Sequence, residues 1–232
     1  MAQSNVLAAI SSRKEERLNS GAFDQVDART FNAVMLATLL WGFIANAAMV
    51  AFLAEPVMQM VANMNRWVFF IGYAVLAFGG ILLAQLSDKP ILSFLGFNLL
   101  VLPMGIELCV LVPMLPAAVV TKALLLTGIV TATMVLLGLV RPQLFMGLGR
   151  TLFIALIVGV VAELVATFVF HYYGAMFDWL FVIIFSGYIG YDIAKSQVYP
   201  KTIDNAIDCA LDIYIDIINL FVRLLSLLSR EE

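Results

Sequence analysis

Charge is scarce in this chain of 232 residues. Only 12% of them are Asp, Glu, Lys or Arg, whereas a soluble domain carries about 25%. The formal net charge of -3 leaves no basic surplus for binding a nucleic acid. Hydrophobic residues make up 63% of the chain, in long runs that exclude a soluble enzyme with one buried core. The composition therefore predicts an all-α integral membrane protein whose main partner is the lipid bilayer.

Cysteine and histidine are also rare, with two cysteines and one histidine in the chain. Cys109 and Cys209 fall inside apolar segments, and two thiols with one imidazole cannot supply a zinc ligand set. We interpret both cysteines as packing residues. Residues 1–30 hold eight charged side chains and no apolar core before a small-residue cleavage site. We therefore expect no signal peptide and a cytoplasmic N-terminal tail over these residues.

Seven apolar stretches of membrane-spanning length remain when the chain is divided at Pro, Gly and charged residues. Their connections are short, so neighbouring helices should pack antiparallel. We predict one seven-helix transmembrane domain over residues 31–232. Its spans are expected at about 31 to 53, 67 to 86, 91 to 113, 117 to 140, 148 to 170, 176 to 193 and 206 to 228.

The orientation follows from Lys and Arg, which are in excess on the cytoplasmic side of membrane proteins. With the N-terminus inside, nine of these residues lie on the inner side and four on the outer side. An odd number of spans then places the C-terminus outside. A retinal protein would need a lysine in its last helix, and we expect Lys195 and Lys201 in the loop before it.

Several carboxylates interrupt the apolar spans. Each costs about 2.5 to 3.5 kcal/mol on insertion scales, so such groups usually face the bundle interior and often mark ion or proton pathways. On a helix with 100° per residue, the acids of the last span share one face with Asn219 and Arg223. We predict an acidic pathway formed by Asp208, Asp212 and Asn219 on that face together with Glu107 and Glu163. We interpret Arg223 as a residue that reaches to the membrane surface. The carboxylates that interrupt the apolar spans are those of Glu107, Glu163, Asp192, Asp208, Asp212 and Asp216.

Asp192 on the sixth span should face Asp212 or Asp216 on the antiparallel seventh span. Two carboxylates in a low dielectric do not easily both ionise, so the pair should share a proton and titrate as a unit near cytoplasmic pH. Such a pair could gate a pathway in response to protons. Asp192, Asp212 and Asp216 are also candidate ligands for Ca²⁺. We expect Ca²⁺ as a bound or transported ion and expect no cofactor. The alternative is that the acids are protonated packing residues.

The segment from Phe185 to Asp192 reads FSGYIGYD, and the segment from Leu211 to Phe221 reads LDIYIDIINLF. These two motifs resemble F-S-x-Y-x-x-Y-D and L-x-L-Y-L-D-x-I-N-L-F of the Bax inhibitor-1 (transmembrane Bax inhibitor motif) family. A looser likeness surrounds Glu107. Relatives usually have a small or neutral residue in place of Asp212.

This resemblance implies a bundle with the last helix central, the N-terminus in the cytosol and, for a bacterial-type member, location in the bacterial inner membrane. It also implies a pH-sensitive Ca²⁺ leak gated by Asp192 and Asp216. A basic partner for this pair is implied in the second helix, where this chain has no Arg or Lys from residue 67 until Lys89.

Three function classes follow, of which a pH-sensitive cation leak channel or transporter is the first. The second is a membrane interaction protein that modulates other membrane proteins or a membrane protease, with the N-terminal tail as its docking element. The third is an intramembrane aspartyl protease, for which Tyr191-Asp192 fits one half of the signature. The other half needs Gly-x-Gly-Asp, and no glycine precedes Asp216 closely enough, so we expect no enzyme.

Overall fold

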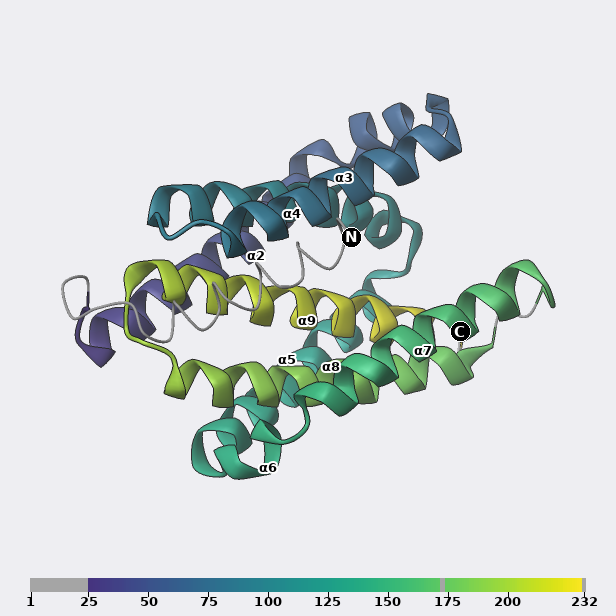
Figure 1. The fold of residues 1–232 in the computed structure, drawn as a ribbon. Coiled ribbons are helices and arrows are strands. Elements are labelled where there is room, and N and C mark those ends of the chain that lie inside the picture. Colours follow the sequence, from purple (N-terminus) through teal and green to yellow (C-terminus); the bar gives the residue numbers. More distant parts are fainter. Residues whose placement is uncertain (1–24, 172–173, 231–232) are drawn as a thin grey trace, which may run out of the picture. The chain divides into compact units, whose positions relative to one another are not determined.

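The computed structural model describes residues 25–171 and 174–230, and all regular elements in these ranges are helices (Figure 1). Most of the predicted N-terminal tail, residues 1–24, lies outside the described part. The described chain forms two compact units. The first contains residues up to Leu111 together with Val198–Leu211, and the second contains Val112–Gln197 and the residues from Asp212 onward. Helix α9 (Ile203–Ser229) is continuous and contributes residues to both units.

The first unit contains α2 (Ala28–Asn63), α3 (Arg66–Gln85) and α4 (Pro90–Leu111). Side chains cap two of these helices, because Asp27 accepts a hydrogen bond from the backbone N–H of Thr30 and Asn65 accepts one from Trp67. Helices α3 and α4 lie side by side (Figure 1). Their closest approach needs glycine, since a Cβ atom on Gly80 would lie 2.6 Å from the carbonyl oxygen of Gly96.

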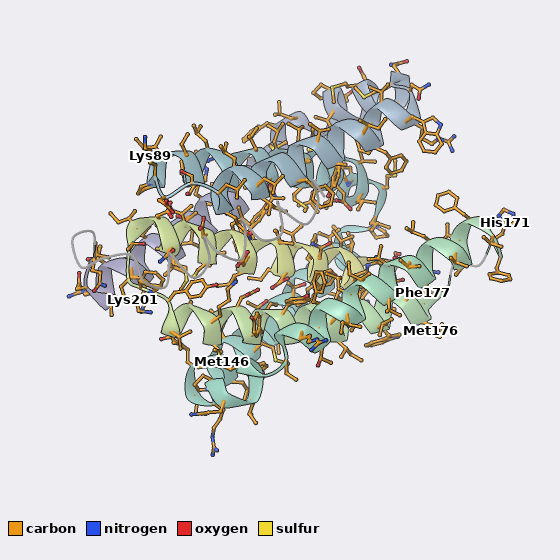
Figure 2. The ribbon with its side chains drawn as sticks, in the orientation of Figure 1. Lys89, Met146, His171, Met176, Phe177 and Lys201 are labelled. Carbon is orange, nitrogen blue, oxygen red and sulfur yellow. The ribbon has the colours of Figure 1, made fainter. Side chains whose placement is uncertain are left out.

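Helix α2 continues to Asn63, past the predicted end of the first span near residue 53. The prediction ended there because Glu55 and Pro56 resemble a helix break. The structure carries Pro56 inside the helix, as membrane helices allow when their neighbours and local adjustments satisfy the freed backbone groups. At the other end of α2, the ammonium group of Lys201 lies 4.5 Å from the centre of the Phe31 ring (Figure 2). Burial lowers the pKa of Lys201.

The second unit contains α5 (Ala117–Val140), the short α6 (Pro142–Met146), α7 (Gly149–Phe168), α8 (Ala175–Val198) and the rest of α9. A single turn of 3-10 helix (Val112–Met114) precedes α5. Its core forms where α8 meets α9, and aromatic and branched side chains fill it. The buried members include Phe181, Phe185, Ile189, Leu220 and Leu224. Helix α6, which was not predicted, brings the Phe145 ring against Gly190 of α8.

Six of the described helices are long and apolar enough to cross a membrane: α2, α3, α4 with its 3-10 extension, α5, α7 and α8. Helix α7 shows their character, because Gly159 is its only buried residue and most of its large apolar side chains are exposed. The chain is therefore a multi-pass helical membrane protein, as predicted. Helix α9 has 27 residues but carries four aspartates and one arginine, and it is not among the six. The seventh span stays a prediction.

Candidate functional site

Helices α8 and α9 place ionisable side chains inside the second unit. Tyr188, Tyr191, Asp192 and Lys195 follow one another on α8 at spacings of three, one and three residues, so they share one face. Other sides of α8 carry glycines, which let side chains of neighbouring helices approach closely. Gly190 accommodates the Phe145 ring, and Gly187 lies against the Leu152 side chain.

The first group of charges, which we name the lysine cluster, consists of Asp192, Lys195, Asp212 and Asp216. Lys195 Nζ lies 2.6 Å from Asp212 Oδ2 and 3.5 Å from Asp192 Oδ1. The ammonium group therefore links α8 to α9 and also pairs with an acid one turn earlier on its own helix. The Lys195 side chain is 14% exposed, so little solvent reaches this contact.

Asp192 and Asp216 lie close enough to interact electrostatically, and each residue is only 6% exposed. The Oδ2 atom of Asp216 is buried and has no hydrogen-bond donor among the described residues. A buried carboxylate oxygen without a donor is costly. The structure thus buries both acids that the family motifs single out, and Oδ2 of Asp216 has no partner among the described residues.

We expected Lys195 in a loop after a sixth span ending near residue 193. It lies instead inside α8, which continues to Val198. The i, i+3 spacing of Asp192 and Lys195 was the available signal, because acid and base at this spacing lie on one helix face. No basic side chain from α3 is needed to explain the charge beside these aspartates.

The remaining acids of the last helix have separate surroundings. Asp208 is buried in the part of α9 that belongs to the first unit. Near it in the sequence, Asp204 accepts a hydrogen bond of 2.5 Å from the Ser93 hydroxyl group on α4. The side-chain amide of Asn219 donates to the Ile215 carbonyl oxygen on its own helix at 2.8 Å. Neither contact involves the lysine cluster.

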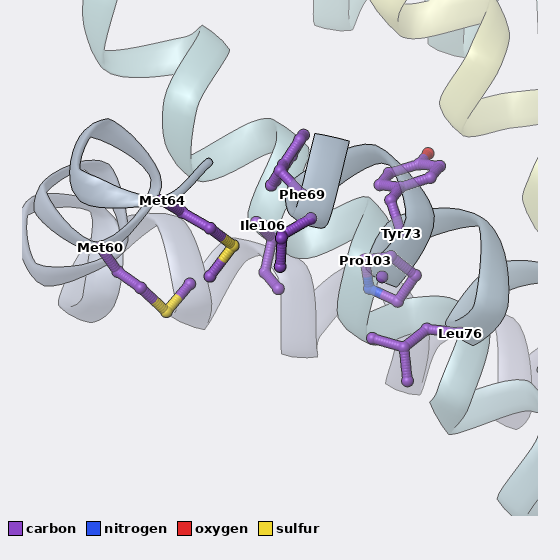
Figure 3. Close-up of a pocket in the computed structure, with 9 residues that line it drawn as sticks. Met60, Met64, Phe69, Tyr73, Leu76, Pro103 and Ile106 are labelled. Atoms are coloured by element: carbon purple, nitrogen blue, oxygen red, sulfur yellow. The ribbon is translucent and has the colours of Figure 1, made fainter. Parts of the chain in front are cut away.

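Glu107 belongs to the first unit, where it accepts a hydrogen bond of 2.8 Å from the Tyr73 hydroxyl group. Tyr73 also borders a small apolar pocket of about 130 Å³ between the end of α2, α3 and α4 (Figure 3). The labelled lining includes Met60, Met64 and Phe69. The predicted acidic pathway residues are therefore divided between the two units.

Glu163 belongs to a second group of charges, the arginine cluster, which consists of Glu163, Asp178, Arg223, Ser226 and Arg230. Arg223 binds both carboxylate oxygens of Glu163, at 2.5 and 2.8 Å, and reaches Asp178 Oδ1 at 3.1 Å. Its guanidinium carbon lies 4.2 Å from the centre of the Phe181 ring. Ser226 donates to Asp178 Oδ2 at 2.9 Å, and Arg230 lies 3.3 Å from the same oxygen.

This arrangement corrects the interpretation of Arg223 as a residue that reaches to the membrane surface. Its partners on α7 and α8 hold it between the helices. Sequence reasoning overlooked Asp178 because it lies in the first turn of α8, where an acid is expected to cap a helix. Glu163, Asp178 and Arg223 each lie in a different one of three neighbouring predicted spans. Their comparable depth was the signal from which their pairing could have been predicted.

Among residues 25–171 and 174–230, no three His, Cys, Asp or Glu side chains are grouped so that they could hold a metal ion. Lys195 lies between two of the three aspartates that were proposed as Ca²⁺ ligands. Any role of Asp192, Asp212 and Asp216 in binding Ca²⁺ therefore stays a prediction, and the observed counterion is the ammonium group of the protein itself.

Apolar spans that enclose ionisable side chains define the class, which is a multi-pass helical membrane protein with a charged interior. The family model described as "Inhibitor of apoptosis-promoting Bax1" matches residues 24–232. The chain belongs to the Bax inhibitor-1 family, which confirms the resemblance found in its two motifs. It is also similar to two Helicobacter pylori proteins, each described as an uncharacterized protein. Identity is 31% for strain J99 and 30% for strain 26695, over 71% of this chain and 71% of each relative.

Proposed function

We propose that the protein is a pH-sensitive cation leak, a channel or transporter for which Ca²⁺ is the first candidate ion, and that Asp192 and Asp216 form its gate. One observation carries the proposal: both carboxyl groups are buried beside the Lys195 ion pairs where α8 meets α9, and Oδ2 of Asp216 has no donor among the described residues. A proton shared between the two groups removes one negative charge and supplies a hydrogen bond. Such a proton couples the contact between α8 and α9 to pH.

Loss of this proton places two negative charges side by side in a poorly solvated interior. Their repulsion is relieved when the carboxylates separate or when a cation enters between them. Either response changes the path available to cations along α9. Protons and cations therefore compete for the same pair of carboxyl groups, which makes cation passage depend on pH.

The proposal includes a topology of seven spans with α9 as the central helix, in the bacterial inner membrane with the N-terminus inside. Residues Asp204 to Ser229 of α9 are all buried or half-buried, which supports an interior position for this helix. Its aspartates prevent it from matching a simple apolar span. An interior position would remove them from contact with lipid, where charge is most costly.

Ion flux into liposomes tests the proposal. The full-length protein is reconstituted, and Ca²⁺, K⁺ and Na⁺ fluxes are measured across a pH series for wild type, Asp192→Asn and Asp216→Asn. We expect pH-dependent flux in the wild type and an altered pH profile in each variant, since an amide cannot share the proton in the same way. Asp88→Asn, a change in the exposed turn before α4, is the matched control and should keep the wild-type profile.

Two results would contradict the proposal. Unchanged pH profiles in both dyad variants would make the aspartates structural. Absence of flux at every pH, in protein shown to be folded, would favour the alternative of a membrane interaction protein.

A further inference from the structure

The apolar pocket that Tyr73 borders in the first unit has a size that suits one small ligand. Its volume is about 130 Å³, and nine residues from the end of α2, from α3 and from α4 line it (Figure 3). An engineered protein cavity of about 150 Å³ stays dry and binds benzene or xenon. The pocket therefore accommodates a single ring or a short piece of chain, and it is too small for a drug-sized molecule.

The lining makes the pocket apolar throughout. None of the nine lining residues is charged, and the Tyr73 hydroxyl group already donates a hydrogen bond of 2.8 Å to Glu107 Oε2. This hydroxyl group points away from Pro103 and Leu76 (Figure 3). The hydrogen bond thus fixes the Tyr73 ring, which presents its carbon atoms to the pocket. A ligand would find no charge to pair with here, so we expect it to be neutral and apolar.

Sulfur atoms and aromatic rings distinguish this lining from a depression between aliphatic side chains. Met60 and Met64 lie one turn apart at the end of α2, and Phe69 and Tyr73 lie one turn apart on α3 (Figure 3). Thioether sulfur makes favourable contacts with aromatic rings, and the flexible methionine side chain adapts to the shape of a partner. Aromatic rings also pair with one another edge to face. These contacts favour an aromatic ligand over an acyl chain.

The place of the pocket along the helices favours the same class of ligand. Met60 lies three residues before the end of α2, and Phe69 lies three residues after the start of α3. At about 1.5 Å per residue, both are about 5 Å from the helix ends. Aromatic rings collect near the ends of membrane spans, at the boundary with water. Met60, Met64 and Val68 are exposed, so the pocket opens at the protein surface.

We infer that this pocket binds one neutral, single-ring aromatic molecule that has partitioned into the membrane boundary. The site goes beyond the proposed leak and does not depend on it. Gly72 offers a way to close the site, because it lines the pocket and no atom lies within 4 Å of the position of a Cβ added to it. A leucine at this position therefore has room for its side chain and would compete with the ligand for the pocket.

Photolabelling tests the inference. The full-length protein in phosphatidylcholine liposomes is irradiated with trifluoromethyl phenyldiazirine, a neutral single-ring probe, and labelled residues are identified by mass spectrometry. We expect saturable labelling of Met60, Met64 or Phe69, which excess toluene lowers at least about fivefold by competition for one site. The exposed apolar side chains of α7 are the internal reference. Their labelling should rise in proportion to the probe and be unchanged by toluene.

Two glycines of α3 provide the matched variants. Gly72→Leu should lower the labelling of the pocket at least about fivefold, because the new side chain takes the place of the probe. Gly79 also has no atom within 4 Å of its Cβ position, but it does not line the pocket. Gly79→Leu should therefore keep the wild-type labelling.

Three results would overturn the inference. The first is labelling of the pocket that does not saturate or that toluene leaves unchanged, and wild-type protein alone can give this result if the variants fail to fold. The second is equal labelling of folded wild type and Gly72→Leu. The third is labelling of the pocket by a phosphatidylcholine with a diazirine in its acyl chain that toluene does not lower, because a lipid chain would then be the occupant.

Discussion

Helix α8 has buried charge near both ends, and the two ends balance that charge differently. In the arginine cluster, two arginines match the carboxylates of Glu163 and Asp178, and every carboxylate oxygen has a partner. In the lysine cluster, the one lysine pairs with Asp192 and Asp212, and Oδ2 of Asp216 has no partner among the described residues. The first arrangement uses the planar fork of arginine, which binds a carboxylate through two parallel hydrogen bonds. The second uses a mobile point charge.

The difference separates a structural tie from a site that can change state. A neutral, fully hydrogen-bonded group has nothing to gain from a proton or an ion and resists disruption. A group with excess negative charge and an unsatisfied oxygen gains from either. Near Asp178, helix α8 is tied to α7 and α9 by ion pairs of Arg223. Near Asp192, the same helix carries charges whose pairing can change.

The largest expected effect concerns the side of the membrane on which each of the two charge clusters lies. Nine of the 13 Lys and Arg residues fall on one side of the seven-span topology, so the lysine cluster should lie near the cytoplasm and the arginine cluster near the outer face. An alkaline phosphatase fused after Glu232 should be active outside the cytoplasm, and a cytoplasmic reporter at the same position should be silent. The reverse pattern would contradict an odd number of spans.

Arg223→Gln should produce the largest loss of stability. It leaves the carboxylates of Glu163 and Asp178 inside the bundle with less compensation, and we expect a loss of about 2 to 3 kcal/mol in unfolding free energy, allowing for partial exposure. Arg223→Lys should recover part of this loss because it restores the charge without the fork. Denaturation in mixed detergent micelles measures both.

The more exposed Arg230 supplies the control for Arg223. Its side chain is 42% exposed, so Arg230→Gln should cost much less. Equal losses for Arg223→Gln and Arg230→Gln would remove the distinction between a buried tie and a surface ion pair.

Gly190→Ala should have a smaller effect, concentrated on the lysine-cluster end of α8. A Cβ atom here would overlap the Phe145 ring, so α8 or α6 must shift, at a cost of about 1 to 2 kcal/mol. Gly128→Ala in α5 is the matched control, since nothing lies within 4 Å of its Cβ position. It should be neutral or stabilising by up to about 1 kcal/mol. Thermal unfolding in detergent compares the two, and the same loss in both would refute the close approach.

The smallest effect concerns an exposed acid, Asp27, at the start of α2. A hydrogen bond from the Thr30 side chain holds the pKa of Asp27 below its ordinary value of 3.8. Its contribution to helix stability is therefore complete above that value and is lost as the pH falls through the lower pKa of the folded protein. Wild type should lose slightly more thermal stability between about pH 5 and pH 2.5 than Asp27→Asn. Parallel curves would show that the ionisation of Asp27 does not contribute to stability.

Part of the candidate site could be predicted from local patterns. Asp192 and Asp216 fall on helices whose apolar runs and short connection require antiparallel neighbours, so the proximity of two acids at matching depth follows from helix geometry. The end of α8 was harder to predict, because a helix can continue through charged residues at the membrane surface as readily as it can end there. For that reason Lys195 was placed outside the site.

The sequence by itself determined that the chain is helical, that it crosses a membrane several times and that its last two helices carry acids which lipid would not accept. Those properties depend on composition and on helical spacing, which act within one segment at a time. Only the tertiary structure decided which charge meets which. Glu163 pairs with Arg223, 60 residues away, and Lys195 pairs with Asp212, 17 residues away. Such pairing depends on the rotation and depth of packed helices, which small residues such as Gly190 set through contacts between segments.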